Sequence, residues 1–250
     1  MKDVRILTAG EQGVVVEFGN KIDPVINNRV HGLGRLLMQQ NGGEIKEVVP
    51  TYRSLLVYFD PAAISRQQLI DKITALLASG DSNASAAAGA NVISIPVCYG
   101  GEYGPDIAFV AEHNGLTEAE VISIHTSEPY LVYMIGFTPG FPYLGGMSER
   151  IATPRLKQPR TRIPAGSVGI AGTQTGFYPL EAPGGWQLIG RTPVKGFDPR
   201  SARPFLASAG DYLHFRSISA KEFESIAREA AAGTYLPVIT KLDRKGGGAQ

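Results

Sequence analysis

The chain has 250 residues, of which 43% are hydrophobic and 19% are charged, as is typical of one or two packed globular domains. Its net charge of +1 excludes a whole-protein field that would attract nucleic acid or an anionic membrane. A single cysteine cannot form an internal disulfide, which favours a reducing compartment. We see neither the pattern of a secretory leader nor a run of ~18 apolar residues that could cross a membrane. We therefore expect a cytoplasmic protein.

Residues 1–80 predict a small α/β domain. Four short apolar runs bounded by turn residues predict strands, at 4–7, 14–18, 45–49 and 55–59. Asp23 and Pro24 mark the start of one helix, and Ser65 with Gln68 forms a capping box before a second. Two helices beside a small antiparallel sheet make a self-sufficient α+β unit.

Residues 81–91 predict a linker, because small residues without a large apolar side chain cannot anchor a core. Residues 92–236 then predict a second, β-rich domain with a closing helix. Within it, residues 136–190 hold 11 of the 30 glycines and 7 of the 17 prolines. This density of turn residues favours a barrel or closed sheet over parallel βαβ units. Residues 237–250 are expected to form a tail.

The segment GFTPGFPYLGG, at 136–146, is too apolar for an ordinary solvent loop and too rich in Gly and Pro for a helix. It carries three aromatic side chains, Phe137, Phe141 and Tyr143. The segment PGGW, at 183–186, adds the only tryptophan of the chain. Rigid aromatic side chains line small-molecule sites and protein interfaces at low entropic cost. Burial of the same rings in a barrel core is the alternative.

Four cations stand within eight residues with no acid among them, namely Arg155, Lys157, Arg160 and Arg162. Three prolines interrupt this run, so it cannot be a helix, and they hold the side chains in an extended presentation. Guanidinium groups suit carboxylates and phosphates. A solvated loop whose cations pair with acids elsewhere is an equal alternative at this stage.

Standard catalytic and metal-binding signatures are absent from the sequence. It contains no Walker A loop, no HExxH, no paired CxxC and no GxGxxG after a strand. The four histidines have no metal-ligand spacing, so we expect no metal on this chain. The nearest match to a nucleophile elbow, at 165–169, is followed by a β-like run in place of a helix, which favours a turn serine.

Four long segments combine unusual composition with ordered motifs: PVCYGGEYGPDI (96–107), YLVYMIGFTPGFPYLGG (130–146), PRTRIPAGSVGIAGTQTGFYPLEAPGGWQLIGRTP (159–193) and GDYLHF (210–215). Together they resemble the family of KipI and of the B subunit of the prokaryotic 5-oxoprolinase, also called allophanate hydrolase subunit 1. The resemblance covers nearly the whole chain. It implies an α+β architecture, with a small α/β N-terminal domain followed by a cyclophilin-like β-barrel.

The resemblance also implies one component of a multi-subunit enzyme, which works with a homologous, larger C subunit (KipA-like) and with an A subunit. The complex opens the lactam of 5-oxoproline (pyroglutamate) to glutamate while ATP is hydrolysed. This chain has no biotin-attachment motif and no ATP-loop motif, so ATP is expected as a substrate of the complex and the chain is expected to be inactive alone. Two alternatives stay open, a KipI-type inhibitor of a sensor histidine kinase and a carboxyltransferase or allophanate hydrolase-like subunit of a urea or amide carboxylase system.

The cation run beside the aromatic loop favours a site for a small anionic substrate. His125, which resembles the family histidine before the central strand, is a candidate acid, base or donor. Arg155 and Arg160 are candidate donors to developing negative charge. The residues expected to bind substrate are Phe137, Pro139, Gly140, Phe141, Tyr143, Arg162, Gln174, Tyr178, Gly184, Gly185 and Trp186. This hypothesis requires that residues 136–146 and 155–162 line one cavity.

Overall fold

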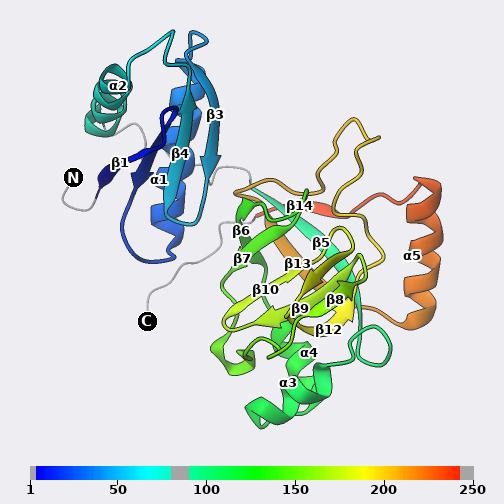
Figure 1. The fold of residues 1–250 in the computed structure, drawn as a ribbon. Helices are drawn as coiled ribbons and strands as arrows, with labels where there is room; N and C mark the ends of the chain where they lie inside the picture. Colours follow the sequence, from blue (N-terminus) through cyan, green and yellow to red (C-terminus); the bar gives the residue numbers. More distant parts are fainter. Residues whose placement is uncertain (1–3, 80–89, 243–250) are drawn as a thin grey trace. The chain divides into compact units, whose positions relative to one another are not determined.

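The structure, a computed structural model, describes residues 4–79 and 90–242 (Figure 1). The chain divides into two compact units, residues 1–88 and residues 89–250. The segment predicted as a linker, 81–91, lies outside the described residues except for its last two positions. Each unit is described by itself below.

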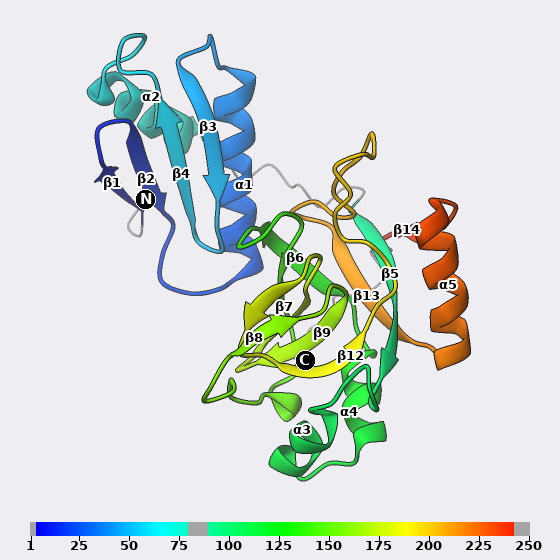
Figure 2. The same ribbon diagram turned by 45° about the vertical axis from the view of Figure 1, so that its right-hand side comes forward.

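The first unit is an antiparallel sheet in the order β1-β2-β4-β3, with two helices against one face (Figures 1 and 2). Its elements in chain order are β1 Arg5–Ala9, β2 Gly13–Glu17, α1 Pro24–Gln39, β3 Ile45–Pro50, β4 Ser54–Phe59 and α2 Arg66–Ser79. Alternate side chains of β2 and β4 are fully buried, among them Val14, Val16, Leu55 and Val57. Because successive strand residues point to opposite faces, this alternation turns one apolar face toward the helices.

Both helices begin where the sequence predicts. The Asp23 carboxylate accepts hydrogen bonds from the N–H groups of Val25 at 2.7 Å and Ile26 at 3.1 Å. At the start of α2, the Ser65 N–H donates to Gln68 Oε1 at 2.9 Å, and the Gln68 N–H donates to Ser65 Oγ at 3.3 Å. The predicted cap and capping box are therefore confirmed.

The second unit is a sheet in the order β10-β9-β12-β5-β13-β6-β7 (Figure 1). Strand β14 is added to β5, and β8 and β11 form a separate pair. Its elements in chain order are β5 Asn91–Tyr99, α3 Ile107–Asn114, α4 Glu118–His125, β6 Tyr130–Ile135, β7 Pro142–Gly145, the 3₁₀ turn η2 Glu149–Ile151, β8 Arg160–Ile163, β9 Ser167–Ala171, β10 Gln174–Phe177, β11 Ala182–Gly184, β12 Gln187–Arg191, β13 Tyr212–Ser217, α5 Ala220–Ala232 and β14 Ile239–Lys241.

This sheet curls into a nearly closed barrel. A Cβ atom placed on Gly176, in terminal strand β10, would lie 3.1 Å from the carbonyl oxygen of Pro142, in terminal strand β7. Fully buried side chains from several strands fill the interior, among them Ile95, Val97, Val132, Ile170 and Phe215. An interior filled by apolar side chains from all sides is typical of small barrels. The predicted α+β class with a barrel domain is confirmed.

The structure corrects one predicted boundary. Residues 237–250 are expected from the sequence to form a tail, but 239–241 form β14, antiparallel to β5, with Ile239 opposite Ile93. The Ser94 N–H also donates to the carbonyl of Val238 at 2.9 Å. The free edge of β5 supplies hydrogen-bond partners for this short β-branched run, and that edge exists only in the folded barrel.

Candidate functional site

The loop between β6 and β7 is the GFTPGFPYLGG segment, and it folds back on itself. The Gly136 N–H donates to the Phe141 carbonyl at 3.1 Å, and the Phe141 N–H donates to the Thr138 carbonyl at 3.0 Å. Phe137 has a φ of 63°. Among the described residues, every other residue with a positive φ is a glycine. This conformation costs an L side chain roughly 1–2 kcal/mol. The loop therefore holds a strained Phe137 in place, and this residue is 64% exposed.

Phe141 is the centre of an aromatic cluster beneath this loop. Its ring makes edge contacts with four others, at centroid distances of 5.5 Å to Phe137, 5.3 Å to Tyr143, 5.4 Å to Tyr178 and 5.6 Å to Trp186. Phe141, Tyr178 and Trp186 are buried, so the core alternative holds for these three rings. Edge contacts of this kind contribute about 0.5–1.5 kcal/mol each, which makes the cluster a rigid base for the exposed Phe137.

These rings enclose a pocket of about 350 Å³. Its lining residues are Phe137, Phe141, Tyr143, Arg155, Pro159, Tyr178, Pro183, Gly184, Gly185 and Trp186. Residues of the aromatic loop and of the cation run therefore line one cavity, as the sequence hypothesis requires. The volume lies in the range of small-molecule sites.

Arg155 gives the pocket its positive charge. Its guanidinium carbon lies 5.9 Å from the centroid of the Trp186 ring, within the range of a cation–π contact. It forms no ion pair with any residue that the structure describes. The guanidinium is therefore available to a ligand, and its planar fork matches a carboxylate.

Tyr178 adds a neutral hydrogen-bond donor at the pocket. A Cβ atom on Gly184 would lie 2.4 Å from the Tyr178 hydroxyl oxygen, so only glycine leaves room for this hydroxyl. Burial raises the pKa of Tyr178 to about 12, against the opposing effect of the charges on Arg155 and Arg160. The hydroxyl is therefore protonated near neutral pH and can donate to an oxygen of a bound ligand.

Two of the predicted arginines are committed elsewhere. Arg160 pairs with Asp106 at 2.7 Å and donates to the Trp186 carbonyl at 3.3 Å. Arg162 pairs with Glu181 at 2.7 Å, and both of these side chains are exposed. Neither arginine lines the pocket. Acids distant in sequence thus pair with both arginines, and the catalytic role expected of Arg160 and the binding role expected of Arg162 stay predictions.

His125 lies in the barrel interior with no exposed surface. Its Nε2 is 2.8 Å from Thr175 Oγ1, and its Nδ1 is 2.7 Å from the Tyr99 hydroxyl. The Thr175 hydroxyl donates its hydrogen to the Gly169 carbonyl at 3.0 Å, so its oxygen must accept from His125. Nε2 therefore carries the ring proton, and Nδ1 accepts from the Tyr99 hydroxyl. Burial lowers the pKa of His125 to about 3. His125 is therefore a neutral core residue in this structure and does not line the aromatic pocket, and its predicted catalytic role stays a prediction.

The remaining predicted residues do not line the pocket. Gly140, at the tip of the loop with a φ of 81°, is held close to the chain at Gly196, whose carbonyl oxygen would lie 2.9 Å from an added Cβ. Pro139 is exposed beside it, and Gln174 begins β10 in a half-buried position. Gly140 therefore shapes the loop, while Pro139 and Gln174 have no place in the described pocket.

The sequence interpretation overlooked three residues. Pro159 and Pro183 line the pocket, and both stand in the segments singled out for their proline and glycine content. Asp106 positions the site, because its Oδ1 binds Arg160 and its Oδ2 accepts from the Leu188 N–H at 2.6 Å. Its partners lie 54 and 82 residues away, so no local pattern could have indicated this role.

Within residues 4–79 and 90–242, no three His, Cys, Asp or Glu side chains gather into a group that could hold a metal ion. None of the helices in those ranges has the length and apolar character needed to cross a bilayer. The polar groups at the pocket include the Arg155 guanidinium and the Tyr178 hydroxyl.

Comparison with known proteins places this geometry in a family. Residues 4–207 match the carboxyltransferase domain family, subdomain C and D. The chain belongs to this family. The B subunit of the 5-oxoprolinase of Bacillus subtilis (strain 168) is 42% identical over 235 residues, covering 88% of this chain and 95% of that protein. The B subunit of the 5-oxoprolinase of Escherichia coli O157:H7 is 39% identical over 216 residues, covering 86% and 96%.

The fold of this carboxyltransferase family also occurs in a larger protein of known structure. The crystal structure of the Kluyveromyces lactis urea carboxylase superposes with a TM-score of 0.77, covering 96% of this chain and 24% of that chain at 21% identity. At that identity the likeness shows a shared fold alone. The family match spans the first unit from residue 4 and includes every residue that lines the aromatic pocket.

Proposed function

We propose that this chain is the B subunit of an ATP-dependent 5-oxoprolinase, which opens 5-oxoproline to glutamate together with its A and C subunits. Two relatives that bear this name support the proposal at 42% and 39% identity over nearly their whole length. The observation that carries it is the aromatic pocket with an unneutralised guanidinium at Arg155. A compact ring with one carboxylate is the type of ligand that such a pocket suits.

The substrate 5-oxoproline is a five-membered lactam that bears a carboxylate. In our proposal the Arg155 guanidinium binds the carboxylate, and the ring lies against the exposed face of Phe137 and the indole of Trp186. The Tyr178 hydroxyl donates to the lactam oxygen, where negative charge develops during ring opening. A lactam is resonance-stabilised, and phosphorylation of that oxygen by ATP would make it a better leaving group.

We also propose that the chain is inactive alone, because its pocket is incomplete. Phe137 is 64% exposed and Arg155 is exposed, so water reaches both groups. Enzymes exclude water where charge develops, and a second polypeptide, the C subunit, would cover this side. In this proposal ATP is consumed by the complex, which places the complex in the cytoplasm.

The two alternatives have weaker support. A carboxyltransferase component of a urea carboxylase system depends on a likeness of fold at 21% identity. An inhibitor of a sensor histidine kinase needs an exposed apolar face but no unneutralised cation in a pocket. Arg155 in its position over Trp186 therefore favours a small anionic ligand.

The test is reconstitution with the cognate A and C subunits, with glutamate release from 5-oxoproline measured with and without ATP. We expect Arg155→Gln to raise KM for 5-oxoproline about tenfold or more, since a charge-assisted bond to the carboxylate is lost. Arg162→Gln is the matched control, because Arg162 is exposed and pairs with Glu181 outside the pocket. Unchanged kinetics in Arg155→Gln would exclude this site. Absence of turnover with the wild-type chain, together with tight binding to a sensor histidine kinase, would favour the inhibitor.

A further inference from the structure

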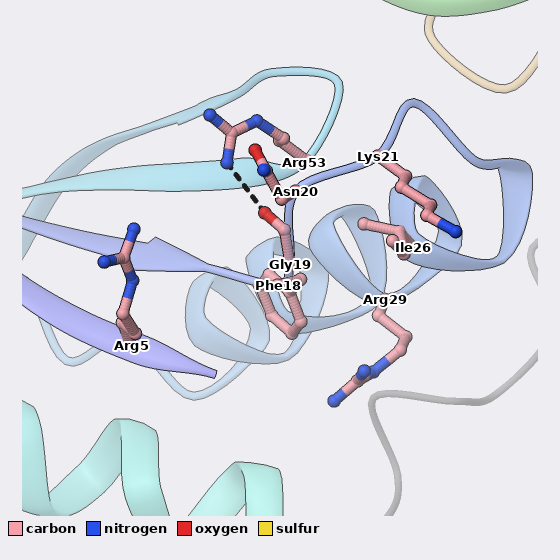
Figure 3. A pocket seen from close by; sticks show the side chains of 8 residues that line it. All are labelled: Arg5, Phe18, Gly19, Asn20, Lys21, Ile26, Arg29 and Arg53. Atoms are coloured by element: carbon pink, nitrogen blue, oxygen red, sulfur yellow. Dashed lines mark hydrogen bonds between the residues drawn. The ribbon is translucent and has the colours of Figure 1, made fainter. Parts of the chain in front are cut away.

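A second concentration of positive charge lies in the first unit, beside the connection from β2 to α1 (Figure 3). It is a cleft of about 670 Å³ lined by Arg5, Phe18, Gly19, Asn20, Lys21, Ile26, Arg29 and Arg53. Four of these residues carry positive charge and none carries negative charge. The aromatic pocket of the barrel unit shares no residue with it.

The four cations come from separate parts of the unit. Arg5 lies on β1, Lys21 between β2 and α1, Arg29 on α1, and Arg53 in the turn between β3 and β4. In Figure 3 their side chains lie around the segment Phe18–Asn20, and their charged ends do not meet at one point. Like charges gathered in one cleft repel each other, and the repulsion persists unless acids or a bound anion offset it.

Acidic side chains of the unit offset little of this charge. Arg5 pairs with Glu17. Lys21, Arg29 and Arg53 form no ion pair with any residue of the described part of the chain. The acid nearest to Lys21 in sequence is Asp23, whose carboxylate is engaged by two N–H groups of the first turn of α1. Three cations at the cleft thus have no carboxylate partner among the residues that the structure describes.

Two of the guanidinium groups are already held in position. Arg53 donates to the Gly19 carbonyl at 2.7 Å, and the guanidinium carbon of Arg29 lies 5.0 Å from the centroid of the buried Phe18 ring. A guanidinium has five N–H donors, so each keeps donors for a ligand. Because their side chains are ordered before binding, less conformational entropy is lost when an anion arrives.

We propose that this cleft binds a polyanion through two or more linked phosphate groups. The cations are spread around the Phe18–Asn20 segment, which suits an extended anion better than a single phosphate. A volume of about 670 Å³ is also in the range of small-molecule sites. Inorganic pyrophosphate and a nucleoside di- or triphosphate share this chemistry. The inference goes beyond the proposed function in assigning a phosphate site to the first unit, and only its nucleotide form rests on the ATP dependence proposed above.

The proposal is tested by calorimetric titration of the full chain at low salt with phosphate, pyrophosphate, ADP and ATP. We expect pyrophosphate to bind, and its affinity to fall as salt screens the cations. Arg29→Gln and Lys21→Gln should each weaken binding about tenfold, the loss expected for one charge-assisted contact. Arg35→Gln is the matched control, since it removes an exposed guanidinium from the same helix outside the cleft, and it should change affinity less than about twofold.

The comparison of ligands identifies the source of the phosphates. Tighter binding of ATP or ADP than of pyrophosphate indicates a nucleotide, and equal binding indicates recognition of the phosphates alone. Circular dichroism checks folding of Arg29→Gln, and Lys21→Gln is a second variant at an exposed side chain without a described partner. The proposal is overturned by absence of pyrophosphate, ADP and ATP binding at millimolar concentration, or by equal losses in Arg29→Gln and Arg35→Gln. Binding lost in Arg155→Gln but kept in Arg29→Gln would also overturn it, because the anion would then bind at the aromatic pocket.

Discussion

The buried His125 predicts a specific loss of stability in mild acid. Its ordinary pKa of 6.5 is lowered by burial to about 3 in the folded protein. Between these values the unfolded chain binds a proton at this ring and the folded chain does not. The free energy of unfolding therefore rises with pH through this window, and the contribution of His125 is lost as pH falls below about 6.5.

The magnitude follows from the two pKa values. At pH 5, which lies about 1.5 units below the ordinary pKa, His125 is protonated in the unfolded state and neutral in the folded state. At ~1.36 kcal/mol per unit, the free energy of unfolding falls by about 2 kcal/mol. Replacement by glutamine, His125→Gln, keeps a neutral polar group near Tyr99 and Thr175 but removes the titration. We expect the variant to be less stable than the wild type at pH 7 and to lose about 2 kcal/mol less than the wild type between pH 7 and pH 5.

Urea unfolding at the two pH values measures this difference. Trp186 is the only tryptophan of the chain and is buried in the barrel unit, so its fluorescence reports on the unit that contains His125. Every other ionisable group is the same in both proteins, so the difference between the two isolates position 125. Equal losses in wild type and variant would refute a neutral, desolvated His125.

Two further substitutions and one matched control test the pocket. Gly184→Ala would place a Cβ 2.4 Å from the Tyr178 hydroxyl, and we expect it to lower the free energy of unfolding by about 1–3 kcal/mol. Gly185→Ala, with its nearest neighbour at 3.6 Å, should lower it by less than about 0.5 kcal/mol, and equal effects in tryptophan-monitored unfolding would contradict the geometry. Phe137→Gly relieves a φ of 63° but removes a pocket wall, so stability should stay level or rise by up to ~1 kcal/mol while KM for 5-oxoproline rises. Lower stability with an unchanged KM would contradict the interpretation that a strained Phe137 forms one wall of the pocket.

The local features of this protein follow from its sequence. The caps of α1 and α2 form as predicted, and Thr117 with Glu120 forms a capping box of the same local kind at the start of α4. The alternation of buried residues in β2 and β4 follows the apolar pattern of the same segments. These features depend on atoms within a few residues of each other, so the order of amino acids alone determines them.

The roles of the charged residues depend on tertiary structure. Arg155, Arg160 and Arg162 look equivalent in sequence, yet only Arg155 lines the pocket, because Asp106 and Glu181 come from distant segments to pair with the other two. The same holds for His125, whose burial results from strands that close around it, and for β14, which needs the edge of β5. The sequence specifies which side chains could bind an anion. Long-range packing decides which of those side chains keep their charge unpaired and accessible to an anion. The reason is that charge pairing and desolvation depend on neighbours in space.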